Sequence, residues 1–252
     1  MEASSVAAKP DLGERAVLKD TYALYRRLFA RSVGLGLVVF GAVELVRAFV
    51  VTRHVSAPAM LLVLVTAAVG LIGTALVQGA LAESVREVHE GARLSSIRLL
   101  YERAAARFGS LVGVSVLTSF GIVAGFLLLV VPGLVLATRW ALAVPVVMVE
   151  GASPRAAMRR SRQLVRGNGR RVFVALLNVW VRIGICSIPF ALVAHGSFLA
   201  VWIATALGAA LTTPYAAHAM SVLYYRLTDP ERTVLPEPNH SWDSVWDEQD
   251  RG

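Results

Sequence analysis

Long apolar segments alternate with shorter basic segments along most of the chain. A helix needs about 20 mainly apolar residues to cross the hydrocarbon core of a bilayer. The pattern therefore predicts an all-α, polytopic membrane helix bundle. We expect its six transmembrane helices at residues 33–52, 59–82, 109–131, 134–149, 171–194 and 197–225.

Two dipeptides are expected to reverse the chain between neighbouring spans. Pro132-Gly133 separates the third and fourth spans, where a missing backbone donor and freedom at positive φ favour a tight turn. His195-Gly196 separates the fifth and sixth spans. The fourth span is short and contains Arg139 and Pro145, so it departs most from a regular membrane helix.

Short amphipathic segments precede the first, third and fifth spans. Their apolar faces are predicted at Leu18, Tyr22, Tyr25 and Phe29, at Leu94, Ile97, Tyr101, Ala104 and Phe108, and at Ala157, Ser161, Leu164 and Val165. Glu90-Gly91-Ala92 and Glu150-Gly151-Ala152 recur ahead of the second and third segments. We interpret the chain as three helix-plus-hairpin units, whose short helices lie at the membrane interface.

The third amphipathic segment has the clearest boundaries. Ser153 suits the N-cap, Pro154 suits the first helical position, and Gly167 is placed to end the helix. Its polar face carries Arg155, Arg159, Arg162 and Arg166. These guanidinium groups either bind the phosphates of anionic phospholipids or only fix the topology of the chain, and the sequence leaves both interpretations open.

Composition supports a membrane protein. The 252 residues are 56% hydrophobic and 17% charged, with a mean hydropathy of +0.61, which is too apolar for an ordinary soluble domain. Twenty-one of the 25 basic residues fall on one side of the predicted topology, so both termini are expected in the cytoplasm. This distribution accounts for the net charge of +8 without a nucleic-acid partner. The basic N-terminal segment does not resemble a secretory signal.

Four ionisable residues lie inside the predicted spans: Glu44, Arg47, Arg139 and Arg182. Charge in a bilayer is costly, so each is expected to face a partner or a wet cavity. A packed polar network that fixes helix docking is the first interpretation. An anion or lipid-phosphate pocket and a proton or solute relay are the alternatives.

Catalytic and metal-binding patterns are missing from the sequence. Glu150 is expected to favour the N-terminus of the following helix or to pair with an arginine of the stripe, rather than to act as a general acid. The five histidines are scattered without metal-ligand spacing, and the single Cys186 is expected to be a packing residue. No phosphate-binding loop or nucleophile elbow is present, so we predict no cofactor.

The chain divides into an N-terminal tail (1–12), the six-span domain (13–228) and a C-terminal tail (229–252). The last segment holds seven acidic and two basic residues and is predicted to be disordered. Trp242 and Trp246 lie one helical turn apart within it. They could dock on the basic helices, insert at the membrane interface or bind another protein.

Residues 132–173 carry a family resemblance. The motifs are Pro132-Gly133-Leu134, the run from Ala137 to Pro145, Val149-Glu150-Gly151, and the basic segment from Ala157 to Phe173. They resemble the membrane domain found in some bacterial glycerophosphoryl diester phosphodiesterases and in stand-alone membrane proteins. The resemblance implies a helical bundle in a bacterial inner or plasma membrane. It does not imply hydrolysis, because the catalytic barrel of those fusions is a separate domain that this chain has no room for.

These observations favour a non-enzymatic membrane protein that contacts anionic phospholipid at the cytoplasmic leaflet. We expect a scaffold or accessory in lipid or envelope handling, within a membrane-protein complex or a homo-oligomer. The first alternative is a transporter or lipid-translocating protein with a central cavity lined by Arg139, Arg182 and Glu44. The second is a membrane-embedded phospholipid enzyme, which requires a carboxylate or histidine pair near the cytoplasmic interface.

Overall fold

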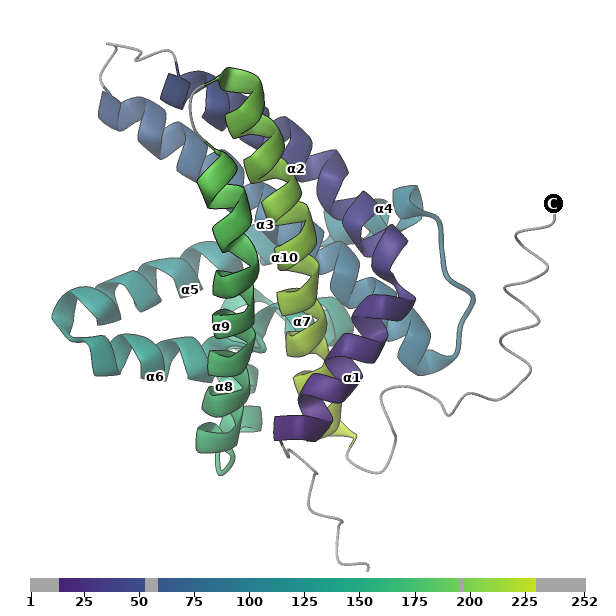
Figure 1. The fold of residues 1–252 in the computed structure, drawn as a ribbon. Helices are drawn as coiled ribbons and strands as arrows, with labels where there is room; N and C mark the ends of the chain where they lie inside the picture. Colours follow the sequence, from purple (N-terminus) through teal and green to yellow (C-terminus); the bar gives the residue numbers. More distant parts are fainter. Residues whose placement is uncertain (1–13, 53–58, 195–196, 230–252) are drawn as a thin grey trace, which may run out of the picture.

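A computed structural model describes residues 14–52, 59–194 and 197–229, and these residues form an all-α bundle (Figure 1). The predicted reversal at His195-Gly196, nearly all of both tails, and Trp242 and Trp246 lie outside the described residues. The helices are α1 (Glu14–Arg27), α2 (Phe29–Thr52), α3 (Ala59–Glu90), α4 (Ile97–Ala106), α5 (Phe108–Leu128), α6 (Val130–Trp140), α7 (Ala143–Glu150), α8 (Pro154–Val165), α9 (Gly169–Val193) and α10 (Phe198–Thr228).

Six helical stretches are long and apolar enough to cross a membrane, which confirms the predicted number of spans. They are Phe29–Phe49, Leu64–Glu90, Phe108–Leu128, Val130–Glu150, Gly169–Val193 and Phe198–Thr228. The second extends eight residues beyond the predicted end at 82, and the fourth is divided between α6 and α7. This is the architecture of a multi-pass membrane protein.

The order of elements follows the predicted helix-plus-hairpin unit. A short helix, α1, α4 or α8, precedes each pair of apolar stretches. Gly91 and Gly151 directly follow α3 and α7 with φ of 70° and 66°. Left-handed backbone at a helix C-terminus favours glycine, so the two Glu-Gly-Ala motifs share one local structure as well as one sequence.

The predicted apolar face of α1 is only partly right: Tyr25 packs on α10 and donates to the Leu211 carbonyl, but the other two predicted aromatic residues do not face the bundle. Val17, Thr21 and Leu24 are fully buried, whereas Tyr22 and Phe29 are 59% and 45% exposed. The aliphatic residues, at helical spacing, form the face that packs inward, in a helix that lies against α10 and α9. Tyr22 and Phe29 are left at the margin of this contact.

Helix α10 lies at the centre of the bundle and packs against α2, α9, α1 and α3. Gly36 on α2 lies against Ala210 on α10, and a Cβ at Gly36 would come within 3.0 Å of the Ala210 Cα. Four residues before Gly36 in the chain, Ser32 forms a buried hydrogen bond of 2.9 Å between its Oγ and His218 Nε2, which joins the same two helices. Small residues and interhelical hydrogen bonds are common ways to join membrane helices.

Helix α4 is tied to α2 by the Tyr101 hydroxyl, which donates a hydrogen bond to the carbonyl of Leu35. Burial raises the pKa of the Tyr101 phenol above its ordinary value, so the hydroxyl remains a neutral donor. The second amphipathic helix therefore packs on the protein through this bond and through buried Leu100 and Ala104.

The reversal between the third and fourth spans lies at Leu129, three residues before the predicted Pro132-Gly133 turn. Leu129 is extended, and Pro132 is the third residue of α6, where a missing N–H costs no helical hydrogen bond. Gly133 serves close packing instead of a turn. A Cβ there would lie 2.6 Å from the ring of Phe126, and one at Gly125 would lie 2.9 Å from the Gly133 Cα.

The fourth span, predicted as one helix, breaks at Ala141 and Leu142 between α6 and α7. Pro145, the third residue of α7, has no N–H to donate to the Ala141 carbonyl, so a continuous helix would lose a hydrogen bond there. The break lies two residues after Arg139.

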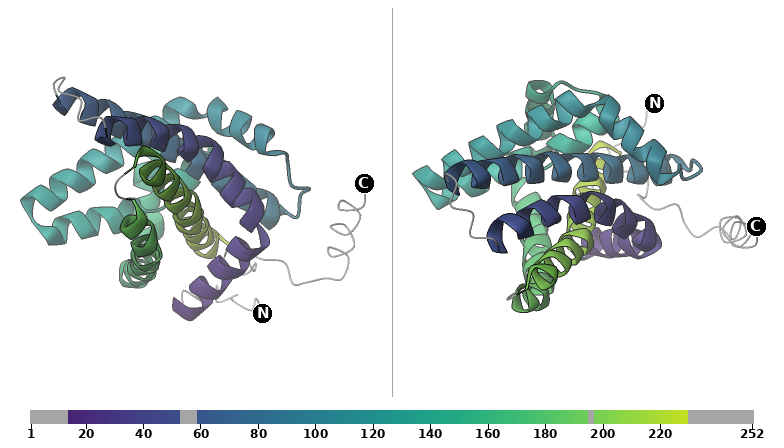
Figure 2. Two further views of the ribbon diagram at one scale, coloured as in Figure 1. Left: turned by 45° about the horizontal axis from the view of Figure 1, so that its top comes forward. Right: turned by 90° about the horizontal axis from the view of Figure 1, so that it is seen from above.

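The α5–α6 hairpin leans away from the α9–α10 hairpin, and the two diverge in both Figure 1 and Figure 2. Leucine and valine side chains at the tip of the α5–α6 hairpin are exposed, as expected for a surface covered by lipid. Helix α8 lies at the base of the corner between the two hairpins (Figure 1).

Candidate functional site

Helix α8 begins and ends at the predicted residues. Ser153 is its N-cap, Pro154 is its first residue, and Gly167 follows its C-cap with φ of 87°. The Ser153 side chain makes no capping hydrogen bond. The helix buries Ala157, Ser161 and Val165, in a packing arrangement with α5, α6 and α7. The stripe of Arg155, Arg159, Arg162 and Arg166 is exposed, as predicted.

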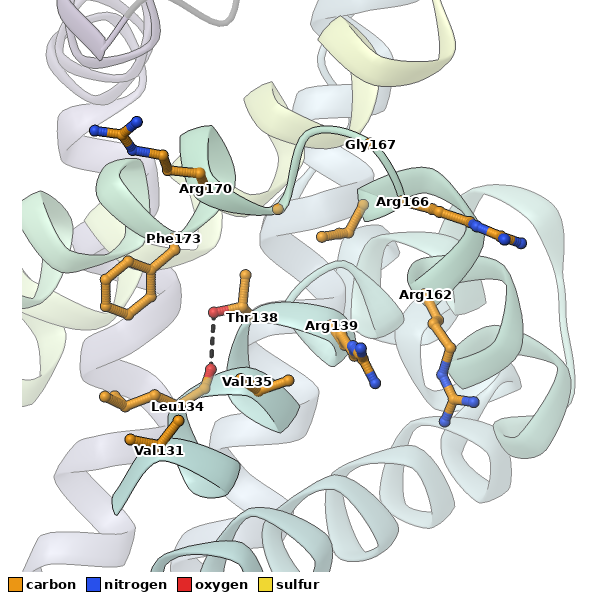
Figure 3. A pocket seen from close by; sticks show the side chains of 12 residues that line it. Val131, Leu134, Val135, Thr138, Arg139, Arg162, Arg166, Gly167, Arg170 and Phe173 are labelled. Atoms are coloured by element: carbon orange, nitrogen blue, oxygen red, sulfur yellow. Dashed lines mark hydrogen bonds between the residues drawn. The ribbon is translucent and has the colours of Figure 1, made fainter. Parts of the chain in front are cut away.

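A pocket of about 750 Å³ lies between α6, α8 and the start of α9 (Figure 3). We call it the arginine pocket, because Arg139, Arg162, Arg166 and Arg170 line it. Its apolar lining includes Val131, Leu134, Val135 and Phe173. The Thr138 hydroxyl donates to the Leu134 carbonyl at 2.8 Å, so this polar group is already satisfied. No acidic residue lines the pocket.

The four arginines of the pocket come from three helices. Figure 3 shows Arg139 of α6 and Arg162 of α8 extending to the same side, while Arg166 and Arg170 extend away from one another. In the described part of the chain, none of the four guanidinium groups forms an ion pair or hydrogen bond with a protein group. Within the residues that the structure describes, this positive charge therefore has no neutralising partner.

The first turn of α9 adds to this positive potential. Gly169, its first residue, lines the pocket, and Asn168 at the N-cap provides no side-chain hydrogen bond. The first N–H groups of a helix lack intrahelical acceptors, and the helix dipole is positive at this end. Both effects favour an anion beside the arginines.

Ser161 joins α8 to the break in the fourth span. Its hydroxyl donates to the Arg139 carbonyl at 2.8 Å and accepts from the Leu142 N–H at 3.2 Å, and the residue is fully buried. The hydroxyl thus satisfies backbone groups that the break would leave without partners. The sequence indicated Ser161 only as a packing residue, because the break itself was not predicted.

Glu150 has a structural position. Its Oε1 accepts hydrogen bonds from Arg160 Nε at 3.0 Å and from the Tyr224 hydroxyl at 3.0 Å. The carboxylate therefore links α7 to α8 and α10. An arginine of α8 was the predicted partner, but Arg160 lies next to the stripe and not within it.

The four intramembrane residues do not come together. Arg47 pairs with Glu44 of the same helix at 3.4 Å, as their spacing predicted. Arg139 lines the arginine pocket. Arg182 is exposed on α9. No contact within the described residues joins the Glu44 pair to either of these arginines.

A second cavity of about 360 Å³ lies among α3, α5, α6, α7, α9 and α10. Its polar lining is uncharged and consists of Thr74, Gln78, Thr118, Thr212 and Thr213. The intramembrane charged residues discussed above do not line it. The central cavity of this bundle is thus a neutral one, and its chemistry differs from that of the arginine pocket.

Two buried carboxylates near the end of α3 were not predicted. Glu83 and Glu87 are each 3% exposed, and Arg103 Nη1 donates to both, at 3.1 and 2.7 Å. Arg86 Nε donates to Glu83 at 3.0 Å, and the Ser95 N–H donates to Glu87 at 2.9 Å. We call these residues the acid-paired cluster. Their spacing of four residues, with Arg86 between them, could have indicated a helical ion-pair network. The sequence analysis ended the second span at 82, so residues 83–108 were interpreted as the connection to the third span.

The acid-paired cluster bears on the enzyme alternative, which requires a pair of carboxylates. General acid–base catalysis needs a group that can exchange a proton with a bound substrate. Glu83 and Glu87 both accept hydrogen bonds from basic side chains and line neither cavity described above. Their contacts are those of a structural ion-pair network.

Metal and thiol chemistry finds little support in the described residues. Among them, no group of three or more histidine, cysteine or acidic residues could hold a metal ion. Cys186 is exposed on α9, so its predicted packing role is wrong. It lies beside exposed Ile185 and Ile188 on the outer surface of that helix.

Comparison with known proteins completes the description of the site. The chain matches no protein-family model, no curated protein and no solved structure. The resemblance of residues 132–173 to that membrane domain therefore stays a prediction, and the arginine pocket is the feature of the structure that indicates a function.

Proposed function

We propose that this chain is a non-enzymatic, multi-pass protein of a bacterial inner membrane that binds anionic phospholipid at the cytoplasmic leaflet. One observation carries the proposal: arginines from three helices, with no partner among residues 14–52, 59–194 and 197–229, surround an apolar pocket that has no acidic lining. A ligand suited to this pocket combines negative charge with hydrocarbon. An anionic phospholipid has both properties, and phospholipid surrounds every membrane protein.

Guanidinium groups suit the phosphate of such a lipid. Arginine offers paired donors that match two phosphate oxygens, and these charge-assisted hydrogen bonds are stronger than neutral ones. Val131, Leu134 and Phe173 supply an apolar surface for the glycerol backbone or the first part of an acyl chain. The pocket joins both types of surface within one corner of the fold (Figure 3).

The cytoplasmic placement is supported by charge distribution. The connection that contains α8 holds seven of the 25 basic residues of the chain. Basic connections favour the cytoplasmic side, where the leaflet is rich in anionic lipid. Labelling of single cysteines, introduced at Ser95 and Ser153 in a Cys186→Ser background, tests this topology. Accessibility of those two positions from opposite sides of the membrane would overturn it.

The lipid proposal is tested by a pair of double variants with the same change in charge. Arg139→Gln/Arg162→Gln removes two arginines of the pocket, whereas Arg155→Gln/Arg159→Gln removes two exposed arginines of α8 that do not line it. Each protein is purified in native lipid patches, and its bound phospholipid is measured by mass spectrometry. At about 1 kcal/mol per basic group, we expect the pocket variant to retain roughly 30-fold less anionic lipid.

The matched control decides how this loss is interpreted. We expect the Arg155→Gln/Arg159→Gln protein to keep most of its bound anionic lipid. Equal losses in both variants would show that general surface charge, and not the pocket, attracts the lipid. Unchanged retention in the pocket variant, with normal membrane insertion, would refute the proposed function.

A lipid-translocating function is the second candidate. Interrupted membrane helices often border transport sites, and Ala141 at the break of the fourth span lines the second cavity. The neutral lining of this cavity suits an uncharged group more than a phosphate. Reconstituted protein would be tested for transfer of a fluorescent lipid between leaflets. A rate equal to that of protein-free vesicles would exclude this candidate.

A lipid-binding membrane protein without an evident reaction suits the role of scaffold or accessory in lipid or envelope handling. On this proposal the protein works within a complex or a homo-oligomer. The mass of the particle purified in native lipid patches provides the test. A mass equal to one chain plus its lipid would argue against both assemblies.

A further inference from the structure

We propose that the arginine pocket selects phospholipids whose headgroup ends in a phosphomonoester, because Ser161 holds Arg139 and Arg162 as a pair directed at one phosphate. This inference rests on the proposed function and names the ligand class of the same pocket. Phosphatidic acid is the simplest lipid of this class.

The pairing of the two arginines is built into the backbone. Arg139 is near the end of α6 and Arg162 is on α8, so they belong to different helices. Ser161, the neighbour of Arg162, donates to the carbonyl of Arg139 at 2.8 Å. This buried hydrogen bond fixes the relative positions of the two backbone segments. Their guanidinium groups extend to the same side of the pocket in Figure 3.

A phosphomonoester matches two guanidinium groups better than a phosphodiester does. It has three terminal oxygens and close to two negative charges at neutral pH, because its second pKa is about 6. A diester has two free oxygens and a single charge. Two guanidinium groups can each donate a pair of hydrogen bonds and together carry two positive charges. The diester leaves part of this capacity unused.

The pH dependence of binding then comes from the ligand. The charged groups that line the pocket are Arg139 on α6, Arg162 on α8, Arg166 at the C-cap of α8, and Arg170 on α9. The lining includes no histidine or carboxylate. A preference that follows protonation of the headgroup is therefore expected.

The apolar lining argues for a lipid over a free phosphate ester. Leu134, Val135 and Phe173 would remain exposed to water beside a small soluble anion, whereas a lipid covers them. Glycerol 3-phosphate carries the same headgroup chemistry without the acyl chains. Displacement by glycerol 3-phosphate therefore distinguishes a lipid ligand from a soluble phosphate ester.

The experiment uses the full chain in nanodiscs that contain equimolar phosphatidic acid and phosphatidylglycerol in phosphatidylcholine. Native mass spectrometry measures the ratio of the two bound anionic lipids. We expect a preference for phosphatidic acid of about fivefold near pH 7.5, which falls toward unity near pH 5, below the second phosphate pKa of about 6. Excess glycerol 3-phosphate should displace little of the bound lipid.

Variants distinguish paired hydrogen bonding by Arg139 and Arg162 from a general effect of positive charge. Arg162→Lys keeps the positive charge but loses the paired donors, so the preference should fall toward unity while phosphatidylglycerol binding persists. Arg159→Lys, three residues before Arg162 and outside the pocket lining, should keep the preference. Ser161→Ala should also reduce the preference, because Arg139 loses its fixed place relative to Arg162. Arg162→Lys remains informative if Ser161→Ala does not fold.

The possible failures are distinguishable. Equal binding of the two lipids by the natural sequence, with both still lost in Arg139→Gln/Arg162→Gln, would overturn the selectivity and leave the proposed function standing. A preference that persists in Arg162→Lys, or that does not change with pH, would also overturn it. Full displacement by glycerol 3-phosphate would assign the pocket to a soluble phosphate ester. Lipid binding that does not depend on the pocket arginines would remove both proposals.

Discussion

Arginine has opposite roles in the acid-paired cluster and in the arginine pocket. In the cluster, Arg86 and Arg103 donate to Glu83 and Glu87, whose side chains are almost completely buried. In the pocket, the arginines are exposed, and no group in the described part of the chain accepts from their guanidinium groups. The same residue type thus holds helices together in one region and is available to a ligand in the other.

The contacts of a basic residue, and not its position along the chain, therefore indicate its role. The cluster and the pocket residues Arg162, Arg166 and Arg170 lie in connections that the positive-inside pattern treats alike, whereas Arg139 lies within a span. Breaking a buried ion pair leaves an uncompensated charge and costs stability. Removing an exposed, unpaired arginine leaves no such charge, so its effect is expected on ligand binding. Variants in the two regions should therefore separate these two measurements.

Glu87→Gln is expected to have the largest effect. Glu87 accepts from Arg103 at 2.7 Å and from the Ser95 N–H at 2.9 Å, and the amide cannot neutralise the arginine. We expect a loss of about 3 kcal/mol in the free energy of unfolding, at the low end for a buried pair because Arg103 is partly exposed and keeps its hydrogen bond to Glu83. Thermal unfolding in nanodiscs measures it. Arg162→Gln is the control and should unfold as the natural sequence does. An unchanged unfolding midpoint for Glu87→Gln would show that the acid-paired cluster does not stabilise the fold.

Gly133→Ala should have an intermediate effect and should act on the region of the pocket. The added Cβ would meet the Phe126 ring at 2.6 Å, so α5 and α6 must separate. Overpacking of this kind costs about 1–3 kcal/mol. Because α6 carries Arg139, anionic lipid retention should fall together with stability. Gly109→Ala is the matched control, since no atom lies within 4 Å of its added Cβ. Equal unfolding midpoints for the two variants would contradict this prediction.

Local patterns in the sequence predicted the helices well. Segment length identified all six spans, and α8 was predicted from its N-cap, its first proline and its terminal glycine. Its buried and exposed faces follow from helical periodicity alone. These features depend on residues within one or two helical turns, which is why a single sequence reveals them.

Features that depend on contacts between distant segments were missed. Arg162 and Arg166 were candidates for lipid binding, and Arg139 was a candidate for a separate polar network, but the sequence does not bring them into one pocket. The role of Ser161 depends on a break in another helix. The reversal at Leu129 was misplaced because Pro132 is as acceptable in the first turn of a helix as in a loop.

Arg160→Gln should have the smallest effect. It tests, within the single helix α8, whether an arginine paired with a carboxylate differs from one that lines the pocket. Arg160 lies on α8 beside the stripe, yet it donates to Glu150 at 3.0 Å, so it belongs with the paired arginines. The pair is partly exposed, and Glu150 keeps its hydrogen bond from Tyr224, which limits the expected loss of stability to about 0.5 kcal/mol. Anionic lipid retention should not change, although the variant loses the same charge as Arg162→Gln. If the two variants lost equal amounts of lipid, the charge of α8 as a whole would explain binding, and pairing would not distinguish the arginines.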